Sequence, residues 1–201
     1  KDFKEKSYKE DRKPKPPRFD ADGEVLGAVA DGEMPLVVEL HRVPELRQFL
    51  ARLPEFGRVR PILAGCSDAR FVADRIAEAG LAVIVNPVEQ GRGGTYGADE
   101  LELAADLNEA GVEVILGSGG VDPNATAALP LLAARAVGHG LPHDVALAAI
   151  TTAPARALDL ADTIGTVEPG KQADLLLLSG DPFASATHVE HVVVAGEVIE
   201  P

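Results

Sequence analysis

The side chains that could do chemistry follow short apolar runs of the chain. Glu39 lies at the end of one such run, and His41 and Arg42 come directly after it. A carboxylate and an imidazole so close together can act as general base and general acid, and a guanidinium can hold an anionic substrate. We predict that Glu39 and His41 are catalytic, with Asp68 after the next run as an alternative base. The predicted substrate-binding residues are Arg42, Asp68 and Asp122.

From Met34 onward, short apolar runs alternate with segments of helical periodicity. The predicted strands are residues 35–40, 59–64, 81–85 and 112–116, and the predicted helices are residues 43–53, 69–79, 98–110 and 124–137. Strands that alternate with helices of this length predict βαβ units and a parallel sheet. Such folds place their chemistry at the C-terminal ends of the strands, which is where Glu39 and His41 lie.

The C-terminal part of the chain begins with two helical segments. Pro142 can open a helix that reaches Ile150, and Pro154 separates it from a second short helix predicted at residues 155–160. The Pro-Gly pair in residues 168–171 predicts a tight turn. The predicted strands after it are residues 173–178, 189–195 and 198–199. The first of these is an apolar run of the kind that forms a buried strand.

Residues 150–182 form a continuous motif, T-x-x-P-A-x-x-L-x-L-x-D-x-I-G-x-V-x-P-G-K-x-A-D-L-L-L-L-x-G-D-P. This motif resembles the C-terminal signature of the amidohydrolase superfamily, whose members include imidazolonepropionase-like and dipeptidase-like hydrolases. The resemblance implies an α/β fold, with the second half of a (β/α) TIM-type barrel at residues 34–160 and part of a small β-sandwich at residues 161–201. Residues 1–33 are then a charged N-terminal segment and linker.

The resemblance also implies a reaction, the metal-dependent hydrolysis of carbon–nitrogen bonds other than peptide bonds. In that family, zinc or another divalent metal activates water, and its ligands follow the first, fifth, sixth and eighth strands. This sequence contains no His-x-His motif for the first strand. The resemblance places Glu39, Gly65 and Gly119 at the other three ligand positions, where active relatives carry His, His and Asp. We therefore predict no metal and no other cofactor for this chain.

Three interpretations of the function follow from these replacements. In the leading one, the chain is a catalytically inactive amidohydrolase-like protein that serves as a small-molecule binding or assembly module. In the second, it is an active hydrolase that uses Glu39 and His41 as non-standard acid and base groups. In the third, it is a fragment whose other half supplies missing ligands. Cys66, the only cysteine, is a lesser candidate for a nucleophile and excludes an internal disulfide.

The composition excludes several classes of partner. A formal net charge of −13 over 201 residues argues against nucleic-acid binding, and no apolar run is long enough to span a membrane. Residues 1–18 are locally basic, which predicts a surface helix and linker, with a basic arm for an anionic partner as the alternative. The chain begins at Lys1 without a signal-peptide pattern, so we expect a trimmed chain or a piece of a longer one. The sequence does not fix the compartment, and the cytoplasm is the favoured one.

Half a barrel leaves two strand edges and an apolar interior without a partner. We therefore expect either a homo-oligomer or docking with a missing N-terminal half. The small β-sandwich of the family also takes strands from the N-terminal end of the chain, which strengthens the second expectation. A small-molecule ligand is a further expected partner.

Overall fold

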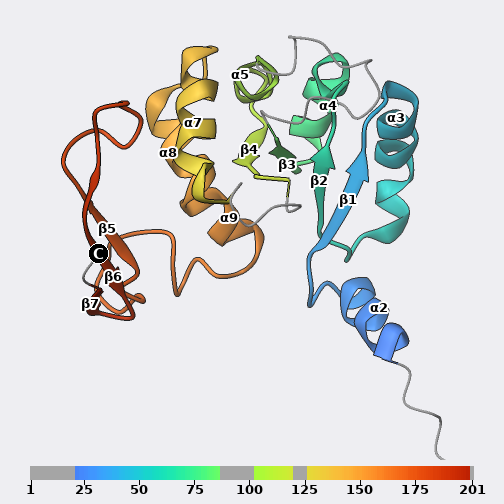
Figure 1. Cartoon of the computed structure of the whole chain (residues 1–201). Helices are drawn as coiled ribbons and strands as arrows, with labels where there is room; N and C mark the ends of the chain where they lie inside the picture. The colour runs from blue at the N-terminus through green and yellow to red at the C-terminus, as the bar shows by residue number, and fades with distance from the viewer. Residues whose placement is uncertain (1–20, 87–101, 120–125, 200–201) are drawn as a thin grey trace, which may run out of the picture.

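The computed structural model describes residues 21–86, 102–119 and 126–199 (Figure 1). The predicted substrate-binding residue Asp122 and the basic segment at residues 1–18 lie outside the described residues. Among the described elements is a four-stranded parallel sheet in the order β1-β2-β3-β4. Its strands are β1 (Leu36–Leu40), β2 (Pro61–Gly65), β3 (Ala82–Val85) and β4 (Glu113–Leu116). The predicted alternation of strands and helices is therefore confirmed.

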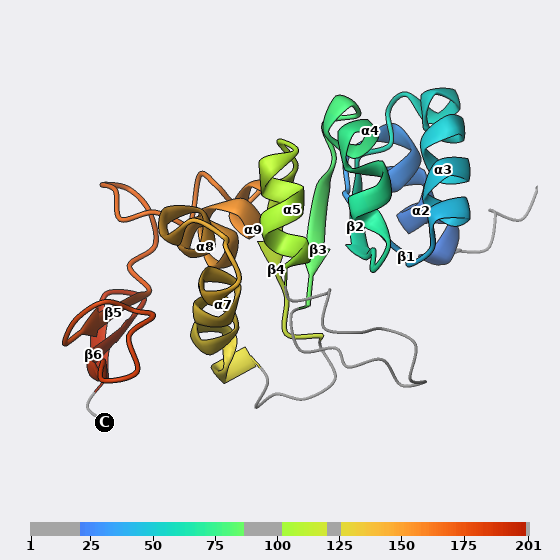
Figure 2. The same ribbon diagram turned by 90° about the horizontal axis from the view of Figure 1, so that it is seen from above.

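Helices cover one face of this sheet, and Figures 1 and 2 show α3, α4 and α5 side by side along it. The helices between and after the strands are α3 (Val43–Arg52), η1 (Leu53–Phe56), η2 (Ala69–Val72), α4 (Ala73–Glu78), α5 (Leu103–Glu109), α7 (Leu129–Gly138) and α8 (His143–Ile150). The core lies between the helices and the sheet, with Leu46, Leu63 and Ile76 each 0% exposed. None of the described helices is long and apolar enough to cross a membrane.

The strands alternate between this helix-covered face and a second face, because successive side chains of a strand point to opposite sides. On β1, Val38 and Leu40 pack against the core, whereas Val37 is 51% exposed and the Glu39 side chain 70% exposed. The neighbours of Glu39 in register on this second face are Ala64, Ile84 and Ile115. We call this second face the inner face, since it corresponds to the interior of a closed barrel.

Helix α9 (Thr152–Ala157) covers one end of the inner face, where its Ala153 forms a small buried cluster with Ile62 and Ile115. The predicted bounds of this helix, residues 155–160, were wrong. The helix begins before Pro154 because a proline in the first turn removes an N–H group that has no partner there in any case. A further helix, α2 (Ala21–Asp31), lies within residues 1–33, which we predicted to be a charged N-terminal segment and linker.

The C-terminal residues form a separate antiparallel sheet in the order β5-β6-β7. Its strands are β5 (Leu175–Leu178), β6 (Val189–Val194) and β7 (Glu197–Ile199). The prediction that the first of these strands is buried was wrong, because Leu176 and Leu177 are 57% and 53% exposed. No second layer covers the sheet among the described residues, so the apolar run of β5 remains at the surface.

One polar contact ties this sheet to the helices of the barrel half. The carboxylate of Asp181, after β5, lies 2.9 and 3.0 Å from Nε2 of His143 at the start of α8. The His143 ring also packs on Phe183, with 4.8 Å between the ring centroids. The backbone N–H of Phe183, and after it the His143 imidazole, hold the pKa of Asp181 below its usual value. This contact joins the C-terminal motif of the sequence to the last helices of the barrel half.

Candidate functional site

The C-terminal ends of β1 and β2 bring together a carboxylate, an imidazole and a hydroxyl. Nε2 of His41 lies 3.2 Å from Oε1 of Glu39, and its Nδ1 lies 3.2 Å from Oγ of Ser67. When Nε2 carries the proton, it donates to Glu39 and leaves Nδ1 to accept the hydrogen of the Ser67 hydroxyl. The His41 side chain is 34% exposed, so solvent or a small molecule can reach this group. The predicted pair Glu39 and His41 is thus in direct contact.

The backbone around His41 is fixed by hydrogen bonds to both neighbouring elements. Oε2 of Glu45 accepts from the N–H groups of Arg42 and His41 at 3.1 and 3.0 Å, which lowers the pKa of Glu45. This is the usual way in which a carboxylate in the first turn satisfies open N–H groups at a helix start. The N–H of Asp68 donates to the carbonyl of His41 at 2.9 Å. His41 therefore stands on a rigid support rather than on a loose loop.

Among the described residues, the other predicted site residues are Arg42, just before α3, and Asp68, just before η2. Arg42 is the residue before the first turn of α3 and is exposed. Oδ2 of Asp68 accepts from the backbone N–H of Val43 at 3.2 Å. This contact gives Asp68 a structural task at the helix N-terminus, and its role as base or substrate ligand stays a prediction.

Gly65, which the resemblance predicts at the sixth-strand ligand position, lies against the His41 ring. Its φ is +76°, and a Cβ atom at this position would lie 2.6 Å from Cε1 of His41. Real Cβ atoms essentially never come so close to another heavy atom. The imidazole of His41 therefore fills the space into which any side chain at residue 65 would project.

Gly119, which the resemblance predicts at the eighth-strand ligand position, likewise has a side chain close to its α-carbon. Its φ is +78°, and a Cβ atom here would lie 2.6 Å from Nδ2 of Asn86, the residue that follows β3. The backbone conformation at this position is one that side chains other than glycine rarely adopt. A carboxylate at residue 119 would displace the Asn86 amide.

These residues do not fit the metal centre that the resemblance implies. Glu39 offers one carboxylate, which His41 already contacts, while Gly65 and Gly119 offer no side-chain ligand atom. A catalytic zinc site needs three protein ligands in addition to its water. Within the described residues 21–86, 102–119 and 126–199, no three His, Cys, Asp or Glu side chains are grouped closely enough to hold a metal ion.

Sequence reasoning missed Ser67 as a member of this site. The signal available was its position, two residues after the end of β2 and one before Asp68. A serine there matches no nucleophile motif, since G-x-S-x-G is absent around it. Its contact with His41 arises only when β1 and β2 pair in register, which no local pattern encodes.

Cys66, the lesser nucleophile candidate, is turned into the protein. It is 0% exposed, its Sγ lies 3.4 Å from the carbonyl oxygen of Ala64, and burial raises the pKa of the thiol to about 12.

We expect the folded chain to react with Ellman's reagent at pH 8 at least ~100-fold more slowly than the chain in guanidinium, because the thiolate is the reactive species. Since Cys66 is the only cysteine, the absorbance change reports the reaction of this thiol alone. Equal rates in the two states would contradict the buried placement.

Comparison with known proteins shows similarity to the amidohydrolase family. Residues 46–200 match the model of the amidohydrolase family. An imidazolonepropionase from Porphyromonas gingivalis is 35% identical over 105 residues, which cover 48% of this chain and 25% of that protein. The match to the family model includes the C-terminal motif and all described strands after β1.

Solved structures with the same architecture support this placement. An amidohydrolase from Thermotoga maritima superposes with a TM-score of 0.81 at 29% identity, covering 99% of this chain and 51% of that chain. An adenosine deaminase from Xanthomonas campestris with bound zinc superposes with a TM-score of 0.59 at 26% identity, covering 90% of this chain and 48% of that chain. The chain thus spans about half the length of these structures.

Proposed function

This chain belongs to the amidohydrolase family, and from that membership we propose that its own strand ends do not support the family's metal-dependent hydrolysis of carbon–nitrogen bonds. The observation that supports this proposal concerns Gly65 and Gly119, the two glycines that the resemblance predicts at ligand positions. Neither glycine has a side-chain ligand atom. The space that a Cβ atom would occupy is filled by His41 at Gly65 and by Asn86 at Gly119. A side chain at either position would require His41 or Asn86 to move. The site therefore differs from the family's metal centre in the placement of neighbouring side chains as well as in its missing ligands.

The function that this geometry supports best is that of a binding or assembly module. β1 and β4 each pair with one strand only among the described residues, so the parallel sheet has two edges. The inner face also exposes Val37 and the carboxylate of Glu39. Unpaired edges and open apolar faces favour association with another chain. A complementary half-barrel, or a second copy of this chain, would cover the two sheet edges and the inner face.

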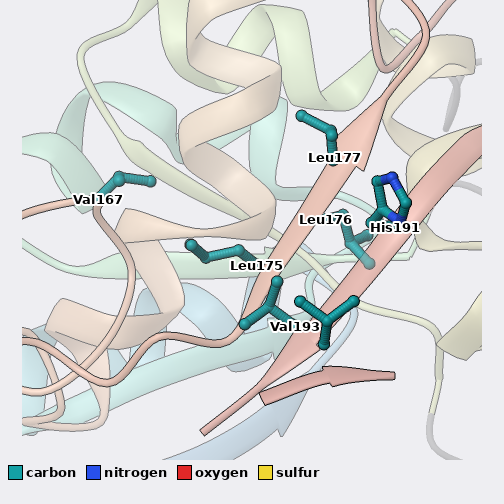
Figure 3. A pocket seen from close by; sticks show the side chains of 7 residues that line it. Val167, Leu175, Leu176, Leu177, His191 and Val193 are labelled. Carbon is teal, nitrogen blue, oxygen red and sulfur yellow. The ribbon is translucent and has the colours of Figure 1, made fainter. Parts of the chain in front are cut away.

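The three-stranded sheet offers a second surface of the same kind. A shallow hollow of about 420 Å³ lies on it, lined mainly by apolar side chains (Figure 3). The residues that line this hollow are Val167, Leu175, Leu176, Leu177, His191, Val193 and Val198. In a β-sandwich such a face packs against a second sheet about 10 Å away. The hollow therefore supports docking of a further sheet or strand.

A metal-free hydrolase is the second candidate function. It is favoured by the 3.2 Å contact between His41 Nε2 and Glu39 Oε1, which joins an acid and a base at the C-terminal ends of parallel strands. This candidate needs no group outside the described residues. It differs from the first in requiring turnover of a substrate.

Elemental analysis tests the loss of the metal centre. We expect zinc, manganese and iron to be substoichiometric in chain purified without chelator and without an affinity tag that contains histidine, because the predicted ligand positions 39, 65 and 119 offer a single carboxylate. Isothermal titration with Zn²⁺ is expected to give no stoichiometric binding, and a Glu39→Gln variant is expected to give the same result. One tightly bound metal per chain, lost in Glu39→Gln, would overturn the proposal.

A further inference from the structure

We propose that Ser67 is a nucleophile, with His41 as its base and Glu39 as the group that orients His41, at a metal-free site for acyl transfer. The inference rests on the second candidate function and names the residue that performs its first step. Ser67 reaches this site from β2, whereas Glu39 and His41 reach it from β1. Neither strand carries the whole group.

The three side chains form a continuous hydrogen-bonded chain. Ser67 Oγ contacts Nδ1 of His41 at 3.2 Å, and Nε2 on the opposite side of the same ring contacts Glu39 at 3.2 Å. A nucleophile beside a base, with the base held by a third group, is the arrangement that activates serine in hydrolases. In the well-known triads the serine contacts Nε2 and the carboxylate contacts Nδ1, whereas here Ser67 contacts Nδ1 and Glu39 contacts Nε2. Either nitrogen of an imidazole can accept a proton while the other donates.

The turn that presents Ser67 is sharply bent and firmly attached. Gly65 and Cys66 have φ values of +76° and +55°, so a residue with a side chain adopts the left-handed region immediately before the serine. Such strained residues gather at functional sites, and the best-known serine nucleophiles sit on a sharp turn after a strand. The N–H groups of Cys66 and Asp68, on either side of Ser67, donate to the carbonyls of Leu40 and His41.

These two backbone bonds fix Ser67 relative to the imidazole. Cys66 N lies 2.6 Å from Leu40 O and Asp68 N lies 2.9 Å from His41 O, so the turn is held against the end of β1 from both sides. The missing side chain of Gly65 completes the arrangement, because the His41 ring lies against bare backbone there. Because Gly65 has no side chain, the His41 ring, which is the proposed base, can lie at this position.

The reaction that these groups can perform is hydrolysis of an ester or an activated amide. Ser67 Oγ attacks the acyl carbon while its proton passes to Nδ1 of His41, and the resulting imidazolium gives that proton to the departing alcohol or amine as its bond to carbon breaks. Water then attacks the acyl carbon and gives a proton to His41, and His41 returns that proton to Ser67 Oγ as the bond between Oγ and the acyl carbon breaks and the carboxylic acid leaves. Glu39 stays ionised throughout and stabilises the imidazolium. A net charge of −13 favours uncharged over anionic substrates.

Two probes test this inference on the purified chain, a fluorophosphonate that labels activated serines and p-nitrophenyl acetate. We expect labelling and acetate release in the parent chain and none above background in Ser67→Ala. We expect a loss of at least ~100-fold in His41→Asn, which removes the base, and about tenfold in Glu39→Gln, which removes the orienting carboxylate. Circular dichroism and melting temperature establish that each variant is folded.

The chain contains a matched control for the serine. Ser179 Oγ lies 3.0 Å from Nδ1 of His188, the same serine–histidine contact, but among the described residues no carboxylate pairs with His188. Ser179→Ala is therefore expected to leave labelling unchanged. Labelling that survives in Ser67→Ala, or that disappears in Ser179→Ala, would overturn the assignment.

A second variant and an independent reading separate the possible failures. If Ser67→Ala is unfolded, Ser67→Cys keeps the shape of the side chain and is expected to react with iodoacetamide, with that rate falling at least ~10-fold in the double variant with His41→Asn. An unreactive or histidine-independent thiol would overturn the inference. Metal content reports on the proposed loss of the metal centre, because it does not depend on whether Ser67 reacts.

Discussion

Gly65→Ala is expected to lower the free energy of unfolding by about 2–5 kcal/mol, combining a residue forced into the left-handed region with an overpacked contact. The first cost arises because φ at this position is +76°. The second arises because the new methyl group would meet Cε1 of His41 at 2.6 Å and Nδ1 at 3.0 Å. Urea denaturation followed by circular dichroism measures the loss as a lower midpoint at an unchanged slope.

Gly80→Ala is the control that separates the two costs. Gly80 follows α4 with a similar φ of +64°, but a Cβ atom there has no heavy atom within 4 Å. We expect Gly80→Ala to lower the free energy of unfolding by only about 1 kcal/mol, the usual cost of replacing glycine at such a helix end. Equal losses in the two variants would show that the His41 ring does not lie against Gly65.

A double-mutant cycle with His41→Ala isolates the contact itself. Removing the imidazole relieves the overlap but leaves the backbone conformation, so the double variant should recover about 1–3 kcal/mol relative to the sum of the single changes. The same logic applies to the histidine that the resemblance predicts for active relatives at this position. A histidine at residue 65 and the present placement of His41 are mutually exclusive, so the metal-binding arrangement and the Glu39–His41–Ser67 arrangement exclude each other.

The order of strands and helices could be predicted from the sequence because each element carries its own local signal. The residues that form β1 are a short apolar run, and those that form α3 show the 3.6-residue period of a helical face. The placement of Glu39 and His41 at a strand end followed from the same pattern. The C-terminal motif then supplied the family, which periodicity alone could not.

What the sequence could not show depended on contacts between distant residues. Ser67 joins the site only through the register of β1 against β2, and Gly65 became informative only when the His41 ring was seen above it. The apolar run of β5 predicted burial, but burial requires an opposing layer that none of the described residues supplies. A local pattern reports which side chains favour burial, and not what covers them.

The exposed face of the C-terminal sheet leads to the second expectation, that Leu177→Asp weakens association of this chain at least ~10-fold. Leu177 and Val198 are 53% and 61% exposed, and both line the shallow hollow on the sheet. Full burial of a leucine side chain is worth about 1.5–3 kcal/mol, which corresponds to roughly 10–150-fold in Kd. A buried aspartate opposes association further because its charge would have to leave water. Sedimentation velocity over a concentration series measures the change.

Phe71→Asp provides the matched control for this face. Phe71 is 67% exposed, more than Leu177, but lies on η2 at the outer side of the barrel half. If general surface hydrophobicity drives association, the two variants weaken it equally. If the sheet face is the docking surface, Phe71→Asp leaves the Kd within about twofold of the parent, since single surface substitutions elsewhere have small effects. A parent chain that stays a stable, non-aggregating monomer at micromolar concentration would contradict association through these faces, and docking to a complementary half would then be tested by mixing the two halves.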